Sequence, residues 1–251
     1  MISASKILNE INDYNLVKLN IDDNYNFEKS DNAYLIKKGS ILSFGDNNFT
    51  QLMGEHDPVG FSEVILAKKK LLKYKLLSDI ELFSFSGIRI RKEVNNCDVV
   101  MKSIIKYSLA RIFGNSKSKG HYLLEDEFIT KYQNFFRKFQ YVKGDQIFVC
   151  DQEPRGMYFI EKGSVSLYTK NDKFITKLVE SESFGESALI SGKLRNNTAI
   201  AECDTLLIEV NSKILDKRIA KETPLVKLTL LSILRRLELI NKLRMPSDFN
   251  S

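Results

Sequence analysis

The stretch Met157–Val165 (MYFIEKGSV) is identical to the stretch Ala33–Ile41 (AYLIKKGSI) at five of nine positions, at an offset of 124 residues. Two further dipeptide matches follow at an offset of 125 residues: Val59-Gly60 with Phe184-Gly185, and Ser78-Asp79 with Cys203-Asp204. One inserted residue reconciles the two offsets, and a collinear series over about fifty positions is hard to obtain by chance. The sequence therefore predicts two copies of one structural unit.

Segments that alternate apolar and polar residues surround these matches, most clearly in the second copy. The strand candidates there are Gln146–Val149, Met157–Lys162, Ser164–Thr169, Phe174–Val179, Thr198–Cys203 and Thr205–Val210. Short strands at roughly 8–12-residue spacing with turn signals between them are typical of an antiparallel sandwich or barrel. The flanking helical patterns are Asp98–Phe113, Leu124–Phe136 and Leu215–Leu243, with Asn115–Gly120 as the expected linker. We therefore predict a mainly β fold with flanking helices, in two domains over residues 1–115 and 116–251.

The composition is that of a folded chain. Of 251 residues, 43% are hydrophobic and 28% are charged, with 16 Phe and 10 Tyr, which is not a disordered composition. The formal net charge of +6 divides into +3 over residues 1–125 and +3 over residues 126–251. Because the positive charge is not gathered in an arm, we expect no nucleic-acid partner.

Patterns for metal binding, membrane insertion and catalysis are missing from the sequence. The three cysteines (Cys97, Cys150 and Cys203) form no CxxC pair, which argues against a zinc site and a disulfide framework. No run of about 18 apolar residues and no signal-peptide pattern is present, so we expect a cytoplasmic protein without a membrane segment. The GxSxG, HExxH and Walker A motifs are absent as well, so we expect no enzyme, no metal and no cofactor.

The second copy contains the stretch Phe184–Ala199 (FGESALISGKLRNNTA), whose residue types suit an anionic ligand. Gly185 lets the backbone approach a ligand closely, and Ser187–Ile190 is expected to form a short helical turn whose free N–H groups favour an anion. Arg195 offers a planar fork of donors that suits a phosphate, and Glu186 accepts hydrogen bonds from hydroxyl groups. The stretch therefore predicts a site for a ligand that has a phosphate and a sugar hydroxyl.

This stretch resembles the phosphate-binding cassette of the cyclic-nucleotide-binding domain family, which reads approximately F-G-E-x-A-L-x-x-x-x-x-R-x-A-T. The resemblance covers Phe139 to about Leu243 and implies a double-stranded β-helix (jelly-roll) fold for both tandem units. It implies that Arg195 binds the cyclic phosphate, that Glu186 accepts the ribose 2′-hydroxyl, and that backbone N–H groups near Gly185 and Ala188 complete the cradle. The implied ligand-binding residues are Phe184, Gly185, Glu186, Ser187, Ala188, Arg195, Asn196, Asn197 and Thr198.

Two residues depart from the family pattern, and the first copy departs from it much further. Cys150 stands where the family usually has a turn glycine, and Asn197 replaces the small residue before Thr198. In the first copy the residues at the positions of Glu186, Ala188, Arg195 and Thr198 are Phe61, Glu63, Lys70 and Lys73. An aromatic ring cannot accept a ribose hydroxyl, and Glu63 would place a negative charge beside a phosphate. We therefore expect the first copy to be a degenerate domain that binds no cyclic nucleotide.

The resemblance implies a non-catalytic sensor of cyclic AMP or cyclic GMP. The second domain would bind the ligand, and the C-terminal helix or the first domain would pass the signal to an unidentified protein partner. The tandem layout is similar to that of the regulatory subunit of cyclic-AMP-dependent protein kinase. One alternative is a ligand-free structural or protein-interaction module of the same fold. Another is a transcription regulator like the catabolite activator protein, but without a DNA-binding domain of its own.

Two surface features leave alternatives open. Five lysines fall within Lys68–Lys75, which fits a patch for a polyanion or, as we favour, a solvated strand edge guarded by lysine. The C-terminal helix has a heptad seam made of Val226, Leu230, Ile233, Leu237 and Ile240. This seam fits either packing on the helix's own barrel or a homodimer through residues 221–244. Arg235 and Arg236 lie where they could reach a ligand or an acidic group of a partner.

Overall fold

The computed structural model describes residues 4–44, 50–68, 72–113, 136–180, 182–186 and 194–242. The chain divides into two compact units. The first unit contains Ile2–Asp98 together with Glu222–Arg235, and the second contains Val99–Lys221 and the chain from Arg236 onward. This division differs from the predicted ranges 1–115 and 116–251 because it assigns residues 99–115 to the second unit and Glu222–Arg235 to the first. The predicted linker Asn115–Gly120 and all but the last residue of the predicted helix Leu124–Phe136 lie outside the described residues.

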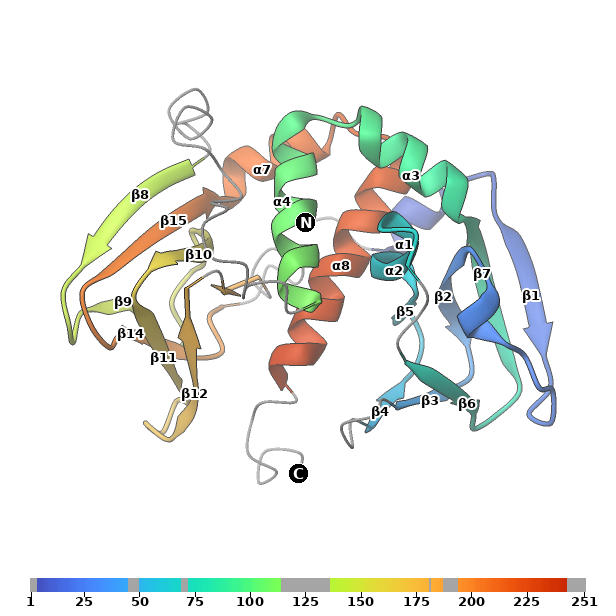
Figure 1. The fold of residues 1–251 in the computed structure, drawn as a ribbon, viewed down its shortest axis with the longest axis horizontal. Helices are drawn as coiled ribbons and strands as arrows, with labels where there is room; N and C mark the ends of the chain where they lie inside the picture. Colours follow the sequence, from blue (N-terminus) through green and yellow to red (C-terminus); the bar gives the residue numbers. More distant parts are fainter. Residues whose placement is uncertain are drawn as a thin grey trace. The chain divides into compact units, whose positions relative to one another are not determined.

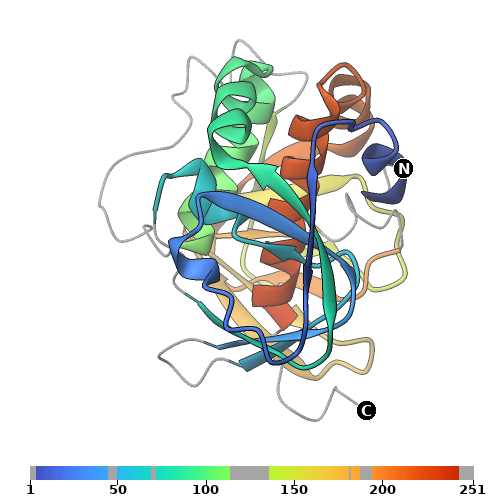
Figure 2. The ribbon, with the colours of Figure 1, turned by 90° about the vertical axis from the view of Figure 1, so that its right-hand side faces the viewer.

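The first unit contains two antiparallel sheets with helices beside them (Figure 1). Its elements are α1 (Ala4–Leu8), β1 (Asn15–Leu19), η1 (Phe27–Lys29), β2 (Asn32–Lys38), β3 (Ile41–Phe44), β4 (Thr50–Met53), β5 (Pro58–Val59), α2 (Phe61–Ile65), β6 (Lys73–Leu76), β7 (Ile80–Ser86) and α3 (Gly87–Asn96). One sheet has the strand order β1-β7-β2-β5 and the other β4-β3-β6. Figure 2 shows β1 and β7 side by side from a second direction. Apolar side chains of both sheets, such as Ile36, Ile41 and Met53, pack together in the core.

The second unit contains two four-stranded antiparallel sheets. Its elements are α4 (Val99–Ile112), β8 (Phe136–Tyr141), β9 (Gln146–Phe148), β10 (Gly156–Lys162), β11 (Ser164–Tyr168), β12 (Phe174–Val179), β13 (Ser183–Phe184), β14 (Thr198–Ala201), β15 (Thr205–Asn211) and α7 (Ser212–Ile219). The sheets have the orders β13-β10-β15-β8 and β12-β11-β14-β9. The last helix, α8 (Pro224–Lys242), begins in the first unit and ends in the second.

Among the described residues, every strand of the first unit has an equivalent in the second, which has β9 in addition. Read from its other edge, the order β8-β15-β10-β13 has the same sequence of equivalent strands as β1-β7-β2-β5. Both units have a register shift at the same place, between Ile36 and Lys38 and between Ile160 and Lys162. Gly39 and Gly163 follow these shifts with the same φ of +94°, which favours glycine. The predicted fold class, mainly β with flanking helices, is confirmed.

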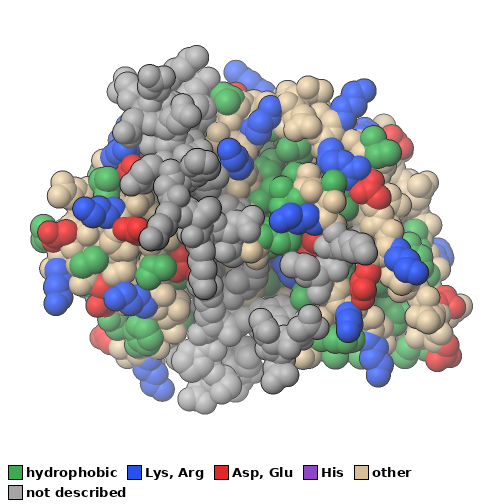
Figure 3. All heavy atoms as spheres, in the orientation of Figure 1, with side chains coloured by type: hydrophobic (Ala, Val, Ile, Leu, Met, Phe, Trp, Pro, Cys, Tyr) green, Lys and Arg blue, Asp and Glu red, His purple; other side chains and the backbone are tan. Residues whose placement is uncertain are grey.

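The lysine-rich segment of the first unit includes an edge strand. In the second unit β9 pairs with β14, whereas among the described residues β6 pairs only with β3. Lys73 and Lys75 on β6 are exposed, which is how natural sheets keep an open edge from pairing with other chains. On the face drawn in Figure 3, basic and acidic side chains of the described residues are interspersed. These observations favour the strand-edge interpretation, while Lys69 and Lys70 lie outside the described residues.

Helix α8 is apolar over more of its surface than a two-stranded seam requires. The seam residues Val226, Leu230, Ile233 and Leu237 are at most 1% exposed, and the side chain of Ile240 lies outside the described part. Five further leucines of the helix are also buried: Leu225, Leu228, Leu231, Leu234 and Leu239. A helix that is apolar on most sides is a buried element of a domain and not a surface helix. Among the described helices, none is long and apolar enough to span a membrane.

Candidate functional site

The predicted anion site lies in the second unit, where Arg195 is held between β13 and β14. The backbone N–H of Arg195 donates to the carbonyl oxygen of Gln152 at 2.9 Å, and the N–H of Asp151 donates to the carbonyl of Arg195 at 2.8 Å. The N–H of Cys150 donates to the hydroxyl of Thr198 at 3.1 Å. The loop between β9 and β10 therefore fixes the backbone on which the arginine stands.

The guanidinium of Arg195 is buried and only partly satisfied. Arg195 is 4% exposed. Its Nη1 donates to the carbonyl of Gly185 at 3.1 Å, and its Nη2 donates to the carbonyl of Gly156 at 2.6 Å. Its Cζ lies 4.1 Å from the ring centroid of Phe148. The Nε atom is buried and has no hydrogen-bond partner among the described residues. Because a guanidinium has five N–H donors, this group keeps donors for an anion.

Because Gly185 has no side chain, the guanidinium of Arg195 can occupy the space beside it. The φ of Gly185 is +80°, a backbone conformation that residues other than glycine rarely adopt. A Cβ built on Gly185 would lie 2.6 Å from Nη1 of Arg195. The pairing of a glycine with an arginine ten residues later is therefore a steric requirement of this site.

Three carboxylate or phenol groups set the electrostatics around the arginine. Burial lowers the pKa of Arg195, and the neighbouring Tyr158, Glu186 and Glu209 oppose this effect. Glu186 is 3% exposed and Glu209 is 5% exposed. The Tyr158 hydroxyl donates to Oε1 of Glu209 at 3.1 Å. Burial, reinforced by Glu209, raises the pKa of Tyr158, so its phenol stays protonated. The site therefore combines one buried guanidinium with two buried carboxyl groups.

The structure brings most of the predicted site residues together. Phe184 is 1% exposed, and its ring stacks on Tyr158 with the ring centroids 5.3 Å apart. Gly185, Glu186 and Arg195 meet as described above, and Thr198 accepts the hydrogen bond from Cys150. Asn196 is exposed and Asn197 is half-buried. Ser187, Ala188 and the rest of the predicted helical turn Ser187–Ile190 lie outside the described residues.

Sequence reasoning missed the layer of residues behind the arginine. Phe148, Tyr158 and Glu209 form this layer, although none of them belongs to the stretch Phe184–Ala199. One signal was available for Glu209, because it is the single charged residue in the otherwise apolar run Leu206–Val210. A charge in a strand that faces a core needs a buried partner. The partner could not be read from the sequence, because Tyr158 lies on another strand.

The equivalent place in the first unit is filled by apolar and acidic side chains. Gly60 has a φ of +79°, close to that of Gly185. Phe61, at the position of Glu186, is 2% exposed and lies 5.9 Å from the ring of Phe85. Glu63, at the position of Ala188, is 4% exposed. Lys70, at the position of Arg195, lies outside the described residues. The backbone conformation of the cassette glycine is thus kept, while the residue at the position of the acceptor is a buried ring.

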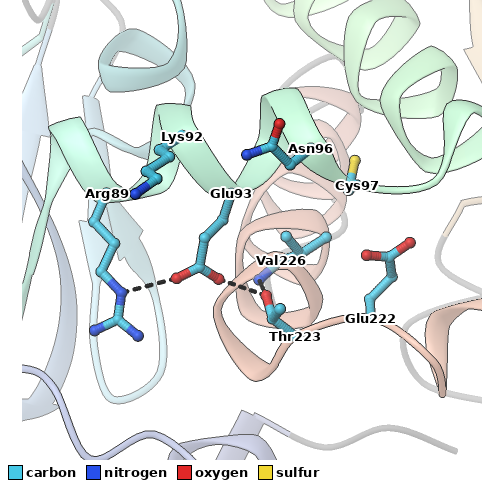
Figure 4. Close-up of a pocket in the computed structure, with 8 residues that line it drawn as sticks. All are labelled: Arg89, Lys92, Glu93, Asn96, Cys97, Glu222, Thr223 and Val226. Atoms are coloured by element: carbon cyan, nitrogen blue, oxygen red, sulfur yellow. Dashed lines mark hydrogen bonds and ion pairs between the residues drawn. The ribbon is translucent and has the colours of Figure 1, made fainter.

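The first unit has a cavity of about 440 Å³ that is separate from the residues of the cassette. Its lining residues lie along α3 and just after it, and around the start of α8 (Figure 4): Arg89, Lys92, Glu93, Asn96, Cys97, Glu222, Thr223 and Val226. The carboxylate of Glu93 accepts hydrogen bonds from Nε of Arg89 and from the hydroxyl of Thr223. Glu222 accepts a hydrogen bond from the N–H of Asp98 at 2.8 Å. These contacts fix the first turn of α8 in the first unit.

Basic side chains further along α8 continue this attachment. Nε of Arg235 donates to Oδ1 of Asp57 at 3.1 Å, and Nζ of Lys227 lies 3.8 Å from Oε2 of Glu10. Asp57 precedes β5, directly before the degenerate cassette of the first unit. Arg235, which the sequence placed near a ligand or an acidic group of a partner, thus reaches an acidic group of its own chain.

Comparison with known proteins agrees with the resemblance in the second copy. Residues 138–222 match the family model described as "Cyclic nucleotide-binding domain". The matched range includes Arg195, Glu186 and Glu209, and it excludes the first copy.

Three solved structures illustrate what the chain is similar to. The regulatory subunit of a cAMP-independent protein kinase A from Trypanosoma brucei shares 14% identity over 90% of this chain and 79% of that chain, with a TM-score of 0.39. The regulatory domain of Toxoplasma gondii PKA, crystallised with cAMP, shares 16% identity over 94% and 89%, with a TM-score of 0.38. The Thermus thermophilus catabolite activator protein shares 26% identity over 48% and 58%, with a TM-score of 0.39.

Proposed function

Residues 138–222 belong to the cyclic nucleotide-binding domain family, and we propose from this premise that the protein is a non-catalytic sensor of cyclic AMP or cyclic GMP. The observation that carries the proposal is the guanidinium of Arg195. It is buried, it is held by the carbonyls of Gly185 and Gly156, and its Nε has no hydrogen-bond partner among the described residues. A buried donor of this kind is costly unless a ligand satisfies it.

In the proposed complex the second unit binds one cyclic nucleotide. The remaining N–H donors of Arg195 bind the cyclic phosphate, and Glu186 accepts the ribose 2′-hydroxyl. The missing side chain of Gly185 lets the backbone N–H groups that follow it, those of Ser187 and Ala188, approach the phosphate. The other members of the proposed site are Phe184, Asn196, Asn197 and Thr198.

A ligand-free interaction role is the second candidate, and one observation favours it for the first unit. Phe61 buries a ring where a ribose acceptor would be needed, and Glu63 adds a buried acidic residue. We therefore propose that the first unit binds no cyclic nucleotide and serves as the surface that transmits the signal to a protein partner.

Equilibrium dialysis of the intact chain against radiolabelled cyclic AMP, and separately against cyclic GMP, is expected to give one bound nucleotide per chain. The single site follows from the intact cassette in the second unit and the replaced one in the first. Cyclic dinucleotides serve as the comparison ligands. Two equivalent sites per chain, or one site that persists at full affinity in Arg195→Gln, would place the nucleotide in the first unit and contradict the proposal.

We further propose that α8 carries the signal. Its residues up to Arg235 belong to the first unit, whereas the residues directly before Glu222 and after Arg235 belong to the nucleotide-binding unit. Binding that orders the second unit would then alter how the first unit holds α8. The same helix would form the interface of the alternative homodimer through residues 221–244.

Substituting Arg235→Gln is expected to loosen the first half of α8. The Asp57 side chain is 11% exposed and that of Arg235 is 35% exposed, so we expect the partly screened pair to contribute about 1 kcal/mol. Amide hydrogen exchange over residues 224–235 should become faster by about fivefold. The exposed Lys221→Gln, just before α8, is the matched control and should leave the exchange unchanged. Equal exchange in both variants would show that the Arg235–Asp57 pair does not hold the helix.

A further inference from the structure

The second unit buries a carboxylate for which the family resemblance provides no role. Glu209 on β15 is 5% exposed, which makes it almost as buried as Arg195 and Glu186. A buried ionised carboxylate costs several kcal/mol unless it is paired and hydrogen-bonded. Its position within an apolar strand therefore needs a specific partner.

The partner is reached through Tyr158. Tyr158 lies directly opposite Glu209 in the register of β10 with β15, and its hydroxyl donates to Glu209 at 3.1 Å. The Tyr158 ring centroid lies 5.6 Å from Cζ of Arg195. The Phe148 ring centroid lies 4.1 Å from the same Cζ, so the guanidinium is close to two rings. One of these rings, that of Tyr158, is hydrogen-bonded through its hydroxyl to the carboxylate of Glu209. At this depth the field of Glu209 on Arg195 is only weakly screened by water.

The first unit shows the same strand position without an arginine. Its equivalent pair is Tyr34 with Ser84, which are opposite each other in the register of β2 with β7. There the Tyr34 hydroxyl is hydrogen-bonded to the hydroxyls of Tyr25, at 2.8 Å, and Ser30, at 2.5 Å. The copy in which lysine replaces the arginine of the cassette thus also has serine in place of the carboxylate. The two charges of the second unit occur together.

We propose that Glu209 is the built-in counter-ion of Arg195, which holds the guanidinium in the ligand-free protein and lowers the affinity of the site for a cyclic nucleotide. Only the effect on nucleotide affinity rests on the proposed function; the pairing of Glu209 with Arg195 does not. Without a ligand, the positive charge of Arg195 is balanced by Glu209 through the field across Tyr158. When an anionic cyclic phosphate binds, Glu209 repels it together with Glu186. The carboxylate therefore acts with opposite sign on ligand-free stability and on affinity.

The substitution Glu209→Gln separates these two effects, because glutamine keeps an acceptor for Tyr158 and removes only the charge. We expect the variant to bind cyclic nucleotide about threefold to tenfold more tightly, and its ligand-free form to unfold at a lower temperature. A role in packing alone would weaken binding and stability together. The matched control is Glu202→Gln, since Glu202 also accepts from a tyrosine in the same unit, with Tyr168 at 3.3 Å.

A double-mutant cycle tests the counter-ion without any ligand. Thermal unfolding of the intact chain is measured for wild type, Glu209→Gln, Arg195→Gln and the double variant. We expect Glu209→Gln to destabilise the wild type and to have little effect, or to stabilise, once Arg195 is glutamine. Should Glu209→Gln fail to fold, Glu209→Ser, which copies Ser84 of the first unit, takes its place in both experiments.

Each outcome decides the proposal. Independent effects in the cycle would overturn the counter-ion, whatever the nucleotide does. If the cycle shows coupling but Glu209→Gln binds nucleotide no more tightly than the wild type, the proposed effect of Glu209 on affinity is wrong. If the wild type binds neither cyclic AMP nor cyclic GMP, the proposed function fails and the affinity half fails with it, while the cycle still judges the pairing of the two charges.

Discussion

Substituting Arg195→Gln is expected to weaken the binding of cyclic AMP or cyclic GMP by at least about 100-fold. Hydrogen bonds to an ionised group contribute about 1.5–3 kcal/mol each, and the variant loses both the charge and the fork of donors. Arg195 is 4% exposed, so bulk water does not readily replace it at the phosphate. Competition against a fluorescent cyclic-nucleotide analogue measures the loss.

The matched control for this variant is Arg155→Gln. Arg155 is exposed and lies directly before Gly156 in the same unit, so its substitution removes a positive charge close in sequence while the Arg195 guanidinium keeps its own hydrogen bonds. Because Arg195 also holds two backbone carbonyls, thermal unfolding of Arg195→Gln should show a loss of about 1–3 kcal/mol. A folded Arg195→Gln that binds within a few-fold of Arg155→Gln would show that the arginine does not contact the phosphate.

Gly185→Ala is expected to weaken nucleotide binding by about tenfold or more. The new Cβ would lie 2.6 Å from Nη1 of Arg195, so the guanidinium has to leave the carbonyl of Gly185. The end of an arginine side chain moves more easily than backbone, and the damage should therefore appear in affinity more than in folding. The φ of +80° adds a conformational cost of about 1 kcal/mol to stability. Titration and thermal unfolding of the same preparation separate the two effects.

Gly144→Ala separates conformational cost from steric displacement. Gly144 has a φ of +92°, but a Cβ built on it meets nothing within 4 Å. Both alanine variants should lose a similar amount of stability from the positive φ, whereas the loss of affinity should be confined to Gly185→Ala. Equal affinities in the two variants would mean that the space beside Arg195 is not part of the binding site.

The repeat and the cassette could be predicted because their signals are local in sequence. Gly163 and Gly185 mark backbone conformations that few other residues adopt, and Arg195 follows at a fixed spacing. Tyr158 and Glu209 were not predicted as site residues, because their pairing depends on the register between two strands separated by other elements. Strand register is set by packing and turn geometry, which single-sequence patterns record poorly.

The course of α8 could not be predicted either. Its heptad pattern left open packing on its own barrel or a homodimer, and neither alternative includes the hydrogen bonds of Thr223 to Glu93 and of Arg235 to Asp57. Periodicity shows that a helix buries one side, but it does not identify the surface against which that side is buried. The partners here precede α8 by more than one hundred residues.

Calorimetric titration of the intact chain with cyclic AMP and then with cyclic GMP measures binding at the Arg195 site most directly. We expect heat of binding with a stoichiometry of one for at least one of the two nucleotides, and its loss in Arg195→Gln under the same conditions. At nucleotide concentrations up to about 1 mM, even a binding free energy near −4.1 kcal/mol gives measurable binding. If the folded wild-type chain binds neither nucleotide under these conditions, the protein is not a nucleotide sensor.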